Sequence, residues 1–213
     1  TRLCRNNIVS NNLMEGTRSA TLQLSGPAVR ANTVSENVLK NIKSLRGVLA
    51  DKGASGNLFV SNTVDGLIQD QAITTAAFCE QGDIPQGQDV YPVRYSEDNT
   101  WTDNTVVNLV QTNVETGVYG FYCNRSHRVT IRGLRVSNVV YPTGSTTIAG
   151  IMVESEYSDA TIDNCTISDI PVGIALVGSG IMQNVNIGQC NILANYRAIW
   201  IHNYMSYAKY GIC

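Results

Sequence analysis

Positive charge is scarce in this sequence. Only 15 of the 213 residues are Lys or Arg, and the formal net charge is −2. No basic run or basic helix is available to neutralise the phosphates of a nucleic acid, so we expect no nucleic-acid partner. The lysines number four: Lys40, Lys43, Lys52 and Lys209.

Long apolar runs are also missing. No segment approaches the roughly 20 residues that a membrane-spanning helix needs, so we expect no membrane insertion. With 43% hydrophobic and 15% charged residues, the chain falls in the globular class, and we predict a single domain over residues 1–213. It begins at Thr1 without a charged-then-apolar leader and ends at Cys213, so we expect a piece of a longer chain.

Metal-binding signatures are absent as well. The six cysteines are widely spread and include no CxxC pair, and no carboxylate cluster has the spacing of a calcium loop. We therefore predict no metal and no cofactor. In a chain of this length we favour buried free thiols over a disulfide framework, which leaves the redox compartment open.

Amphipathic runs of ten or more residues at a period of 3.6 do not occur, which argues against helical repeats. A short phrase recurs instead, and its apolar residue marks a period: Val9, Val34 and Val60 are 25 and 26 residues apart. A second set of marks keeps the same period, at Leu22, Val48 and Ile73. The phrase is VSNN (9–12), VSEN (34–37), VSNT (60–63), VSNV (136–139) and ISDI (167–170).

The second half of the chain repeats more deeply. Ile131, Ile162 and Ile187 fall in one column, and Leu134, Cys165 and Cys190 fall in the next. A further strand aligns in each unit, as GFYCN (120–124), GIMVE (150–154), GIALV (173–177) and AIWIH (198–202).

Short alternating strands with Gly, Asn, Ser and Asp at their ends indicate units of two or three strands joined by tight bends. Stacking such units about 4.8 Å apart closes an apolar core and satisfies the backbone groups between coils. The sequence thus predicts an all-β right-handed parallel β-helix. The recurrent phrase would mark a corner, where Asn tolerates left-handed backbone. Cys165 and Cys190 would be stacked inward, close enough for a disulfide, although a reduced pair is favoured.

The repeat lapses over residues 74–105, where two prolines and several acids interrupt the columns. We predict an irregular insertion there, and a shorter one at 141–147. Such excursions either build binding walls or are simply tolerated.

The isoleucine columns, Gly-Ile strands and Asn-Ser corners resemble the pectin-lyase-like β-helices, and within them bacteriophage tailspikes and capsule depolymerases. The resemblance covers most of the chain and is architectural. It implies a homotrimer on a virion tail that binds and cleaves bacterial capsular polysaccharide or lipopolysaccharide through carboxylates. A secreted or cell-surface location is the alternative.

Known catalytic signatures of such folds are not matched. SNTVDG (61–66) resembles the NTD of polygalacturonases but carries an extra Val64, and the paired aspartates and Gly-His-Gly expected after it are missing. Hydrolysis of plant pectin is therefore not expected.

Alternation along the repeated strand nominates a site. If Ile and Val point inward, one outer column contains Tyr122 and Trp200, and its neighbour contains Glu154 and His202. An outward Trp needs a partner, either a subunit interface or a sugar face. Glu154 and His202 would lie two coils apart, roughly 10 Å, which leaves room for a substrate. We predict Glu154 as a catalytic residue and Tyr122, Trp200 and His202 as substrate-binding residues.

A second carboxylate cluster lies near the start of the irregular segment. Asp65 and Asp70 are the alternative catalytic residues, with Glu80 and Asp83 beside them in the sequence. Arg132 and Asp163 would share an outer column and form an ion pair.

Two functions from different classes remain. The chain is an endo-acting polysaccharide depolymerase, a glycosidase with an acid and a base or a lyase, or it is a non-enzymatic adhesin that holds the same glycan without cleaving it.

Overall fold

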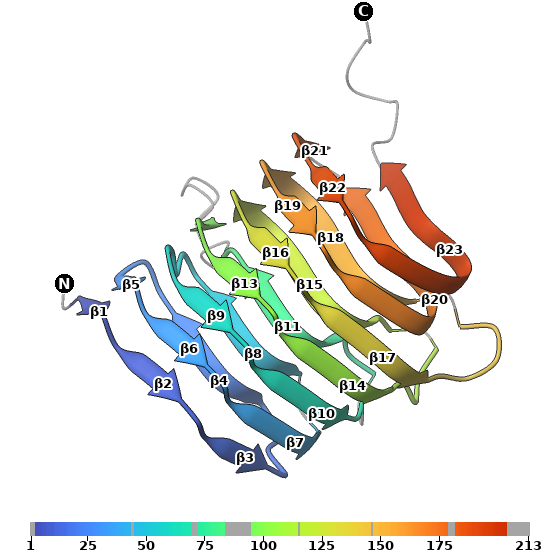
Figure 1. Ribbon diagram of the computed structural model, residues 1–213, viewed down its shortest axis with the longest axis horizontal. Coiled ribbons are helices and arrows are strands. Elements are labelled where there is room, and N and C mark those ends of the chain that lie inside the picture. Colours follow the sequence, from blue (N-terminus) through green and yellow to red (C-terminus); the bar gives the residue numbers. More distant parts are fainter. Residues whose placement is uncertain are drawn as a thin grey trace, which may run out of the picture.

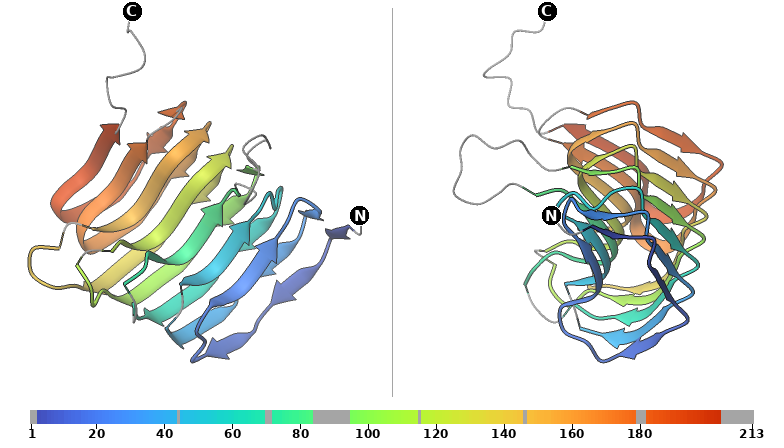
Figure 2. Two further views of the ribbon diagram at one scale, coloured as in Figure 1. Left: turned by 180° about the vertical axis from the view of Figure 1, so that it is seen from behind. Right: turned by 90° about the vertical axis from the view of Figure 1, so that its left-hand side faces the viewer.

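The backbone winds into a right-handed parallel β-helix (Figure 1). The computed structural model describes residues 3–43, 45–69, 72–83, 95–114, 116–145, 147–178 and 182–203, excluding the side chains of 155–158, 182 and 203. All of its strand pairs are parallel, and each strand pairs with its equivalents in the coils before and after it. This confirms the predicted fold class. Viewed from the N-terminal side, the coils lie one behind another (Figure 2, right).

The first sheet forms the front row of Figure 1. It contains β2 (Ile8–Ser10), β6 (Thr33–Ser35), β9 (Leu58–Val60), β13 (Thr100–Thr102), β16 (Thr130–Arg132), β19 (Thr161–Asp163) and β22 (Asn186–Gly188).

The second and third sheets are continuous through two long strands that run from one into the other, β20 (Thr166–Gly178) and β23 (Asn191–Asn203). The second sheet contains β3 (Leu13–Glu15), β7 (Val38–Ile42), β10 (Thr63–Leu67), β14 (Thr105–Val110) and β17 (Arg135–Val140). The third contains β4 (Ala20–Ser25), β8 (Arg46–Asp51), β11 (Thr75–Gln81), β15 (Val118–His127) and β18 (Ile148–Ser158). Four short strands complete the set: β1 (Cys4–Arg5), β5 (Val29–Arg30), β12 (Ser96–Glu97) and β21 (Met182–Gln183).

The interior is filled by like residues stacked on one another. Ile131, Ile162 and Ile187 are paired in register, as the sequence predicted, and the first two are fully buried. In the earlier coils the same column holds larger rings. Phe59 and Trp101 stack face to face with centroids 3.8 Å apart and an interplanar angle of 5°.

The glycines of the repeated strand are required by the narrow interior. A Cβ atom added to Gly150 would lie 2.5 Å from Cγ2 of Ile167 and 2.9 Å from the carbonyl oxygen of Gly173. Because the second and third sheets approach closely here, a side chain at this position would force the sheets apart.

Corners of successive coils use left-handed backbone at equivalent positions, as predicted for Asn. At the corner between the first and second sheets these residues are Asn11, Glu36, Ser61, Asp103, Gly133, Asn164 and Gln189, with φ between 47° and 64°. Short polar side chains and Gly dominate this set because they adopt positive φ at low cost.

Beside the corners, two ladders of asparagines run up the first half of the helix. In each ladder Oδ1 of one Asn accepts hydrogen bonds from the backbone N–H and Nδ2 of the Asn in the coil before, as Asn62 does from Asn37 at 3.1 and 3.0 Å. The ladders are Asn7, Asn32, Asn57 and Asn99, and Asn12, Asn37, Asn62 and Asn104. In the second ladder the backbone carbonyl of each Asn also accepts a hydrogen bond from a backbone N–H of the next coil, and this series continues to the carbonyl of Leu134. The column of Leu134 was predicted from the sequence.

Several details of the predicted register were wrong. Val34 pairs with Phe59, so Val60 lies one position away from the column assigned to it, and Val48 pairs with Phe78 instead of the position of Ile73. Val136 belongs to the second sheet, next to Val106. The phrase therefore occurs at two different bends, and unequal coil lengths shifted the alignment.

Within the segment expected to be irregular, 74–105, the described residues continue the coils. Strand β11 continues the third sheet, and β13 continues the first. Residues 84–94 of this segment lie outside the described part. The single-domain organisation remains a prediction. No helix long and apolar enough to cross a bilayer occurs in the ranges described.

Candidate functional site

The outer side of the third sheet carries the predicted site columns. Tyr122 pairs with Met152, which pairs with Ala175, and Ala175 pairs with Trp200. The adjacent outer column contains Asn124, Glu154, Val177 and His202 in consecutive coils. The predicted order of both columns is therefore confirmed. We call Tyr122, Asn124, Glu154, Trp200 and His202 the outer patch.

The predicted solvent exposure of this face was wrong. Tyr122, Met152 and Ala175 are only 6%, 8% and 0% exposed, because they belong to a second apolar cluster outside the coil. In this cluster Tyr119 stands between Ala76 and Ala149 of the neighbouring coils. The rings of Tyr119 and Tyr122 are nearly parallel, at 12°, with centroids 5.4 Å apart.

Two arginines cover the aromatic column. The guanidinium carbon of Arg46 lies 5.3 Å from the ring centroid of Tyr122, and that of Arg197 lies 4.7 Å from the ring of Trp200. These distances fit cation–π contacts. Since the arginines come from the first and last thirds of the described chain, the face has positive charge at two separate points.

A short hydrogen-bonded chain links the two columns. The hydroxyl of Tyr122 donates to Oε2 of Glu154 at 2.5 Å, and Nδ2 of Asn124 donates to the same hydroxyl at 2.9 Å. Burial, followed by the bond to Glu154 and its charge, raises the pKa of Tyr122 well above its ordinary value. Tyr122 therefore stays a phenol that donates to Glu154. This arrangement holds one oxygen of the carboxylate in place.

Trp200 and His202 complete the patch on β23. Their rings lie 5.7 Å apart at an angle of 26°. Trp200 is half-buried against the apolar cluster, and His202 is exposed. Only Val177 lies between Glu154 and His202 in their column, which places the two residues roughly 10 Å apart by the spacing of strands.

The alternative carboxylates are not brought to the patch. Asp65 lies on the second sheet and accepts a hydrogen bond from Nδ2 of Asn108 at 2.6 Å. Asp70 lies outside the described residues. Asp83 follows β11 and is half-exposed. The catalytic roles of Glu154, Asp65 and Asp70 remain predictions.

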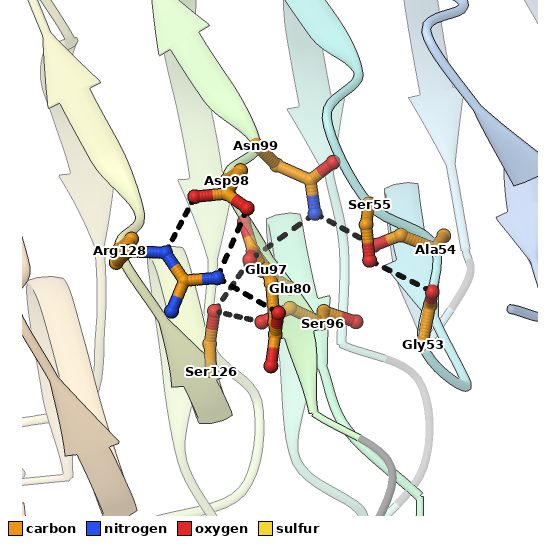
Figure 3. A network of polar contacts seen from close by, with 10 residues as sticks. All are labelled: Gly53, Ala54, Ser55, Glu80, Ser96, Glu97, Asp98, Asn99, Ser126 and Arg128. Carbon is orange, nitrogen blue, oxygen red and sulfur yellow. Dashed lines mark hydrogen bonds and ion pairs between the residues drawn. The ribbon is translucent and has the colours of Figure 1, made fainter.

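Glu80 is fully buried in the core, so it does not belong to a surface cluster. Its carboxylate accepts hydrogen bonds from Nε1 of Trp101 at 2.7 Å, from Nδ2 of Asn99 at 3.2 Å and from Oγ of Ser126, part of which Figure 3 shows. Burial raises the pKa of Glu80 to about 7, and these hydrogen bonds partly oppose the rise. Asn99 is the last Asn of the first ladder, and Glu80 is the acceptor for its Nδ2.

An exposed ion-pair cluster lies beside this network. Arg128 bridges Glu97 at 2.8 Å and Asp98 at 2.6 Å, and its hydrogen bonds lower the pKa of Asp98 (Figure 3). The predicted pair of Arg132 and Asp163 is confirmed at 3.1 Å. The Arg128 cluster is solvent-exposed, so it contributes little to stability.

The predicted free state is confirmed for the cysteines in the described part, but the predicted burial holds only for Cys79, Cys123 and Cys165, since Cys4 is exposed and Cys190 is half-buried. Cys4, Cys79, Cys123, Cys165 and Cys190 are free. Burial raises the pKa of Cys79 to about 11 and that of Cys165 to about 12, so neither thiol ionises readily. Cys213 lies outside the described residues.

Two features of the site were missed in the sequence. One is the carboxylate of Glu80, which accepts a hydrogen bond from the last Asn of the first ladder. The other is Trp101, which the sequence analysis did not identify. The 25-residue spacing of Asn7, Asn32 and Asn57 was a visible signal for the ladder. No signal separated an inward Glu80 from an outward one, because the strand was taken to be irregular. Among the described residues, no group of three or more His, Cys, Asp or Glu is placed to hold a metal ion.

Comparison with known proteins supports the architecture. A family described as "Right handed beta helix region" matches residues 87–211, which is more than half of the chain. No curated protein and no solved structure gave a match.

Proposed function

The chain belongs to the right-handed β-helix family, and from that premise we propose that it binds and cleaves a bacterial surface polysaccharide as a tailspike-type β-helix. The fold itself is compatible with proteins that bind or degrade polysaccharides. The proposed ligand is a capsular polysaccharide or the glycan of lipopolysaccharide. A homotrimer on a virion tail is the proposed assembly, with secretion or cell-surface display as the alternative location.

The pairing of Tyr122 with Glu154 beside stacked aromatic rings is the observation that carries this proposal. A carboxylate fixed by a phenol suits the polar edge of a sugar ring, and the half-buried ring of Trp200 on the same face suits its apolar face. Trp200 extends the aromatic column toward His202.

Glu154 is the proposed acid–base group. Its Oε2 accepts the Tyr122 hydrogen bond, and no described residue donates to Oε1 by a bond seen in the structure. Oε1 can therefore take a proton from a water molecule or from the sugar carbon beside a uronate carboxyl group. In the first reaction the activated water bonds to the anomeric carbon as the glycosidic C–O bond breaks. In the second reaction a C=C bond forms as the C–O bond to the neighbouring sugar breaks. In both reactions the departing oxygen takes its proton from solvent.

A second candidate function is binding without cleavage. Glycosidases that invert use two carboxyl groups about 6.5–9.5 Å apart. Within the described part of the Glu154 column, the other carboxylate is Asp51, three coils away or roughly 14 Å. This separation favours an adhesin or a lyase over a hydrolase with two acids.

Incubation with purified capsular polysaccharides and lipopolysaccharide glycans tests the proposal. New reducing ends without ultraviolet absorbance from an unsaturated uronate indicate a hydrolase, and both signals indicate a lyase. Saturable binding with neither signal indicates the adhesin. Absence of binding to every glycan would contradict both functions.

A further inference from the structure

An open hollow of about 620 Å³ lies in the first coils of the helix, where β1 and β5 pair, and is separate from the outer patch (Figure 1). This volume falls in the range of small-molecule sites, about 300–1,000 Å³. Four apolar residues and two basic ones line it: Leu3, Pro27, Ala28, Ala31, Arg5 and Arg30. We call it the N-terminal hollow.

The hollow is open because a small residue occupies its corner. Val29 packs against the core, so its neighbour Arg30 points outward. Ala31 follows with a φ of 53°, in the left-handed region that Ala rarely adopts. In later coils the equivalent corner carries Asp98 and Arg128, whose longer side chains form an ion pair. Ala31 leaves this space empty.

Two like charges stand side by side in the hollow. Arg5 and Arg30 pair in register in neighbouring coils, about 4.8 Å apart by the spacing of strands. Like charges directly opposite each other are destabilising. Within the described part, ion pairs join Arg128 and Arg132 to acids, but not Arg5 or Arg30. The acid in their column, Glu97, lies two coils beyond Arg30, roughly 10 Å away, and pairs with Arg128.

One hydrogen bond orients the guanidinium of Arg30. Its Nε donates to the carbonyl oxygen of Pro27 at 3.1 Å, and both residues line the hollow. No described residue accepts from Nη1 or Nη2 of Arg30 by a bond seen in the structure. The two N–H groups at the end of the side chain are therefore available as a pair. Such a pair matches the two oxygens of a carboxylate.

We propose that the N-terminal hollow is a second glycan site, which binds a uronic acid residue of a polysaccharide. Arg30 and Arg5 bind its carboxylate, and Leu3 and Pro27 contact an apolar face of its ring. The choice of a carboxylate follows from the arginines, whereas the choice of a sugar rests on the proposed function. An acidic polysaccharide contacts the protein at the hollow and at the outer patch, and two linked contacts raise the overall affinity.

A nuclear magnetic resonance titration of the isotope-labelled chain tests this site, because the backbone amide signals show where a small probe binds. Methyl β-D-glucuronide and methyl β-D-glucoside are matched probes, since they differ only by a carboxylate in place of a hydroxymethyl group. At neutral pH the glucuronide should shift the signals of Asn6, Arg30 and Ala31 saturably. The glucoside should bind about tenfold more weakly or not at all. Acetate, which has no ring, should also bind more weakly than the glucuronide.

Charge-removing variants show which side chains hold the carboxylate. Arg5→Gln and Arg30→Gln should each weaken glucuronide binding about tenfold. Arg135→Gln makes the same change at an exposed position of the second sheet and should leave the affinity unchanged. All three arginines are exposed, so the variants should fold, and urea unfolding verifies this.

Two results would overturn the site. Equal affinity for the glucuronide and the glucoside, or unchanged affinity in both Arg5→Gln and Arg30→Gln, would show that the hollow does not bind a uronic acid. Inorganic phosphate that binds as tightly as the glucuronide, and is lost in Arg30→Gln, would show a general anion site instead.

The outer patch is followed separately in the same spectra. Oligosaccharides from capsular polysaccharide and lipopolysaccharide are titrated, and the signals of Trp200 and His202 report on the patch. If these signals shift while the hollow fails its tests, the hollow is wrong and the proposed function stands. If the hollow binds the glucuronide and no oligosaccharide shifts the patch, the second site stands and the proposed function fails.

Discussion

The hydroxyl of Tyr122 donates a 2.5 Å hydrogen bond to Oε2 of Glu154 in the next coil. The two residues stand in neighbouring outer columns of the third sheet, 32 positions apart in the chain. A solenoid brings them together because its coils stack in register. The bond connects the column of Tyr122 and Trp200 with the column of Glu154 and His202, and the proposed activity depends on this hydrogen bond.

Replacing Glu154 by Gln should abolish cleavage while leaving glycan binding intact. Loss of a positioned acid–base group typically lowers the rate 10²–10⁴-fold. Reducing-end release over time gives the rate, and calorimetry gives the affinity. Asp163→Asn, on the first sheet, is the control and should cleave at the wild-type rate.

Tyr122→Phe should lower kcat about fivefold with little change in KM. Tyr122 positions the carboxylate through one hydrogen bond, and such a bond contributes about 1 kcal/mol. A purely structural role would reduce thermal stability without separating kcat from KM. An unchanged kcat in a well-folded variant would show that the Tyr122 bond plays no part in the reaction.

The two tryptophans should give opposite results. Trp200→Ala removes a half-buried ring from the outer patch, and about tenfold weaker glycan binding is expected with little loss of stability. Trp101→Ala removes a ring that is 1% exposed and stacked on Phe59, so about 3–5 kcal/mol of stability should be lost. Calorimetric titration and urea unfolding measure both quantities. Unchanged affinity of Trp200→Ala, with an altered oligomeric mass, would instead place Trp200 in a subunit interface.

Glu80 should make the stability of the fold depend on pH. Its pKa in the folded state is about 7, above the ordinary value of 4.5, so the folded protein retains a proton that the unfolded chain releases. The stabilisation is complete below the unfolded pKa and is lost as the pH rises through the folded pKa. Over this window the loss amounts to roughly 3 kcal/mol.

Glu80→Gln supplies the comparison, because it cannot titrate. Urea unfolding at pH 5 and pH 8 should show that the wild type loses stability relative to the variant at the higher pH. Glu97 and Asp98 are present in both proteins, so their titration cancels. Parallel pH profiles of the two proteins would mean that Glu80 does not hold a proton in the folded state.

In the second asparagine ladder, replacing a middle Asn should cost more stability than replacing the first Asn. Asn62→Ala leaves the backbone N–H and Nδ2 of Asn37 without their acceptor in the core, and about 3 kcal/mol should be lost. Asn12 is the first rung of the same ladder and is exposed, and no asparagine donates to it from a preceding described coil. Asn12→Ala should therefore cost much less. Equal losses in urea unfolding would contradict the ladder account.

The stacking of coils could be predicted from the sequence because apolar residues that recur at a fixed period pack on one another in successive coils. Ile131, Ile162 and Ile187 are an example, and the register of Glu154 with His202 followed from the same alignment. Pattern matching failed where coil length varies, as at Val60, since one extra residue moves a side chain to the other side of a strand.

Burial on the outer side could not be read from alternation. An outward position is exposed only if nothing packs over it, and outward side chains such as Tyr119 and Tyr122 stack on each other within an apolar cluster. Glu80 is the reverse case. An acidic residue is expected outside, and only the donors of Asn99, Trp101 and Ser126, which come from later coils, make its burial acceptable.

A paired titration and cleavage assay of the wild type and Glu154→Gln on one purified bacterial surface glycan tests the central claim most directly. The account predicts that both proteins bind the glycan with similar affinity and that only the wild type releases new chain ends. Cleavage by Glu154→Gln at the wild-type rate, or failure of both proteins to bind any glycan, would contradict it.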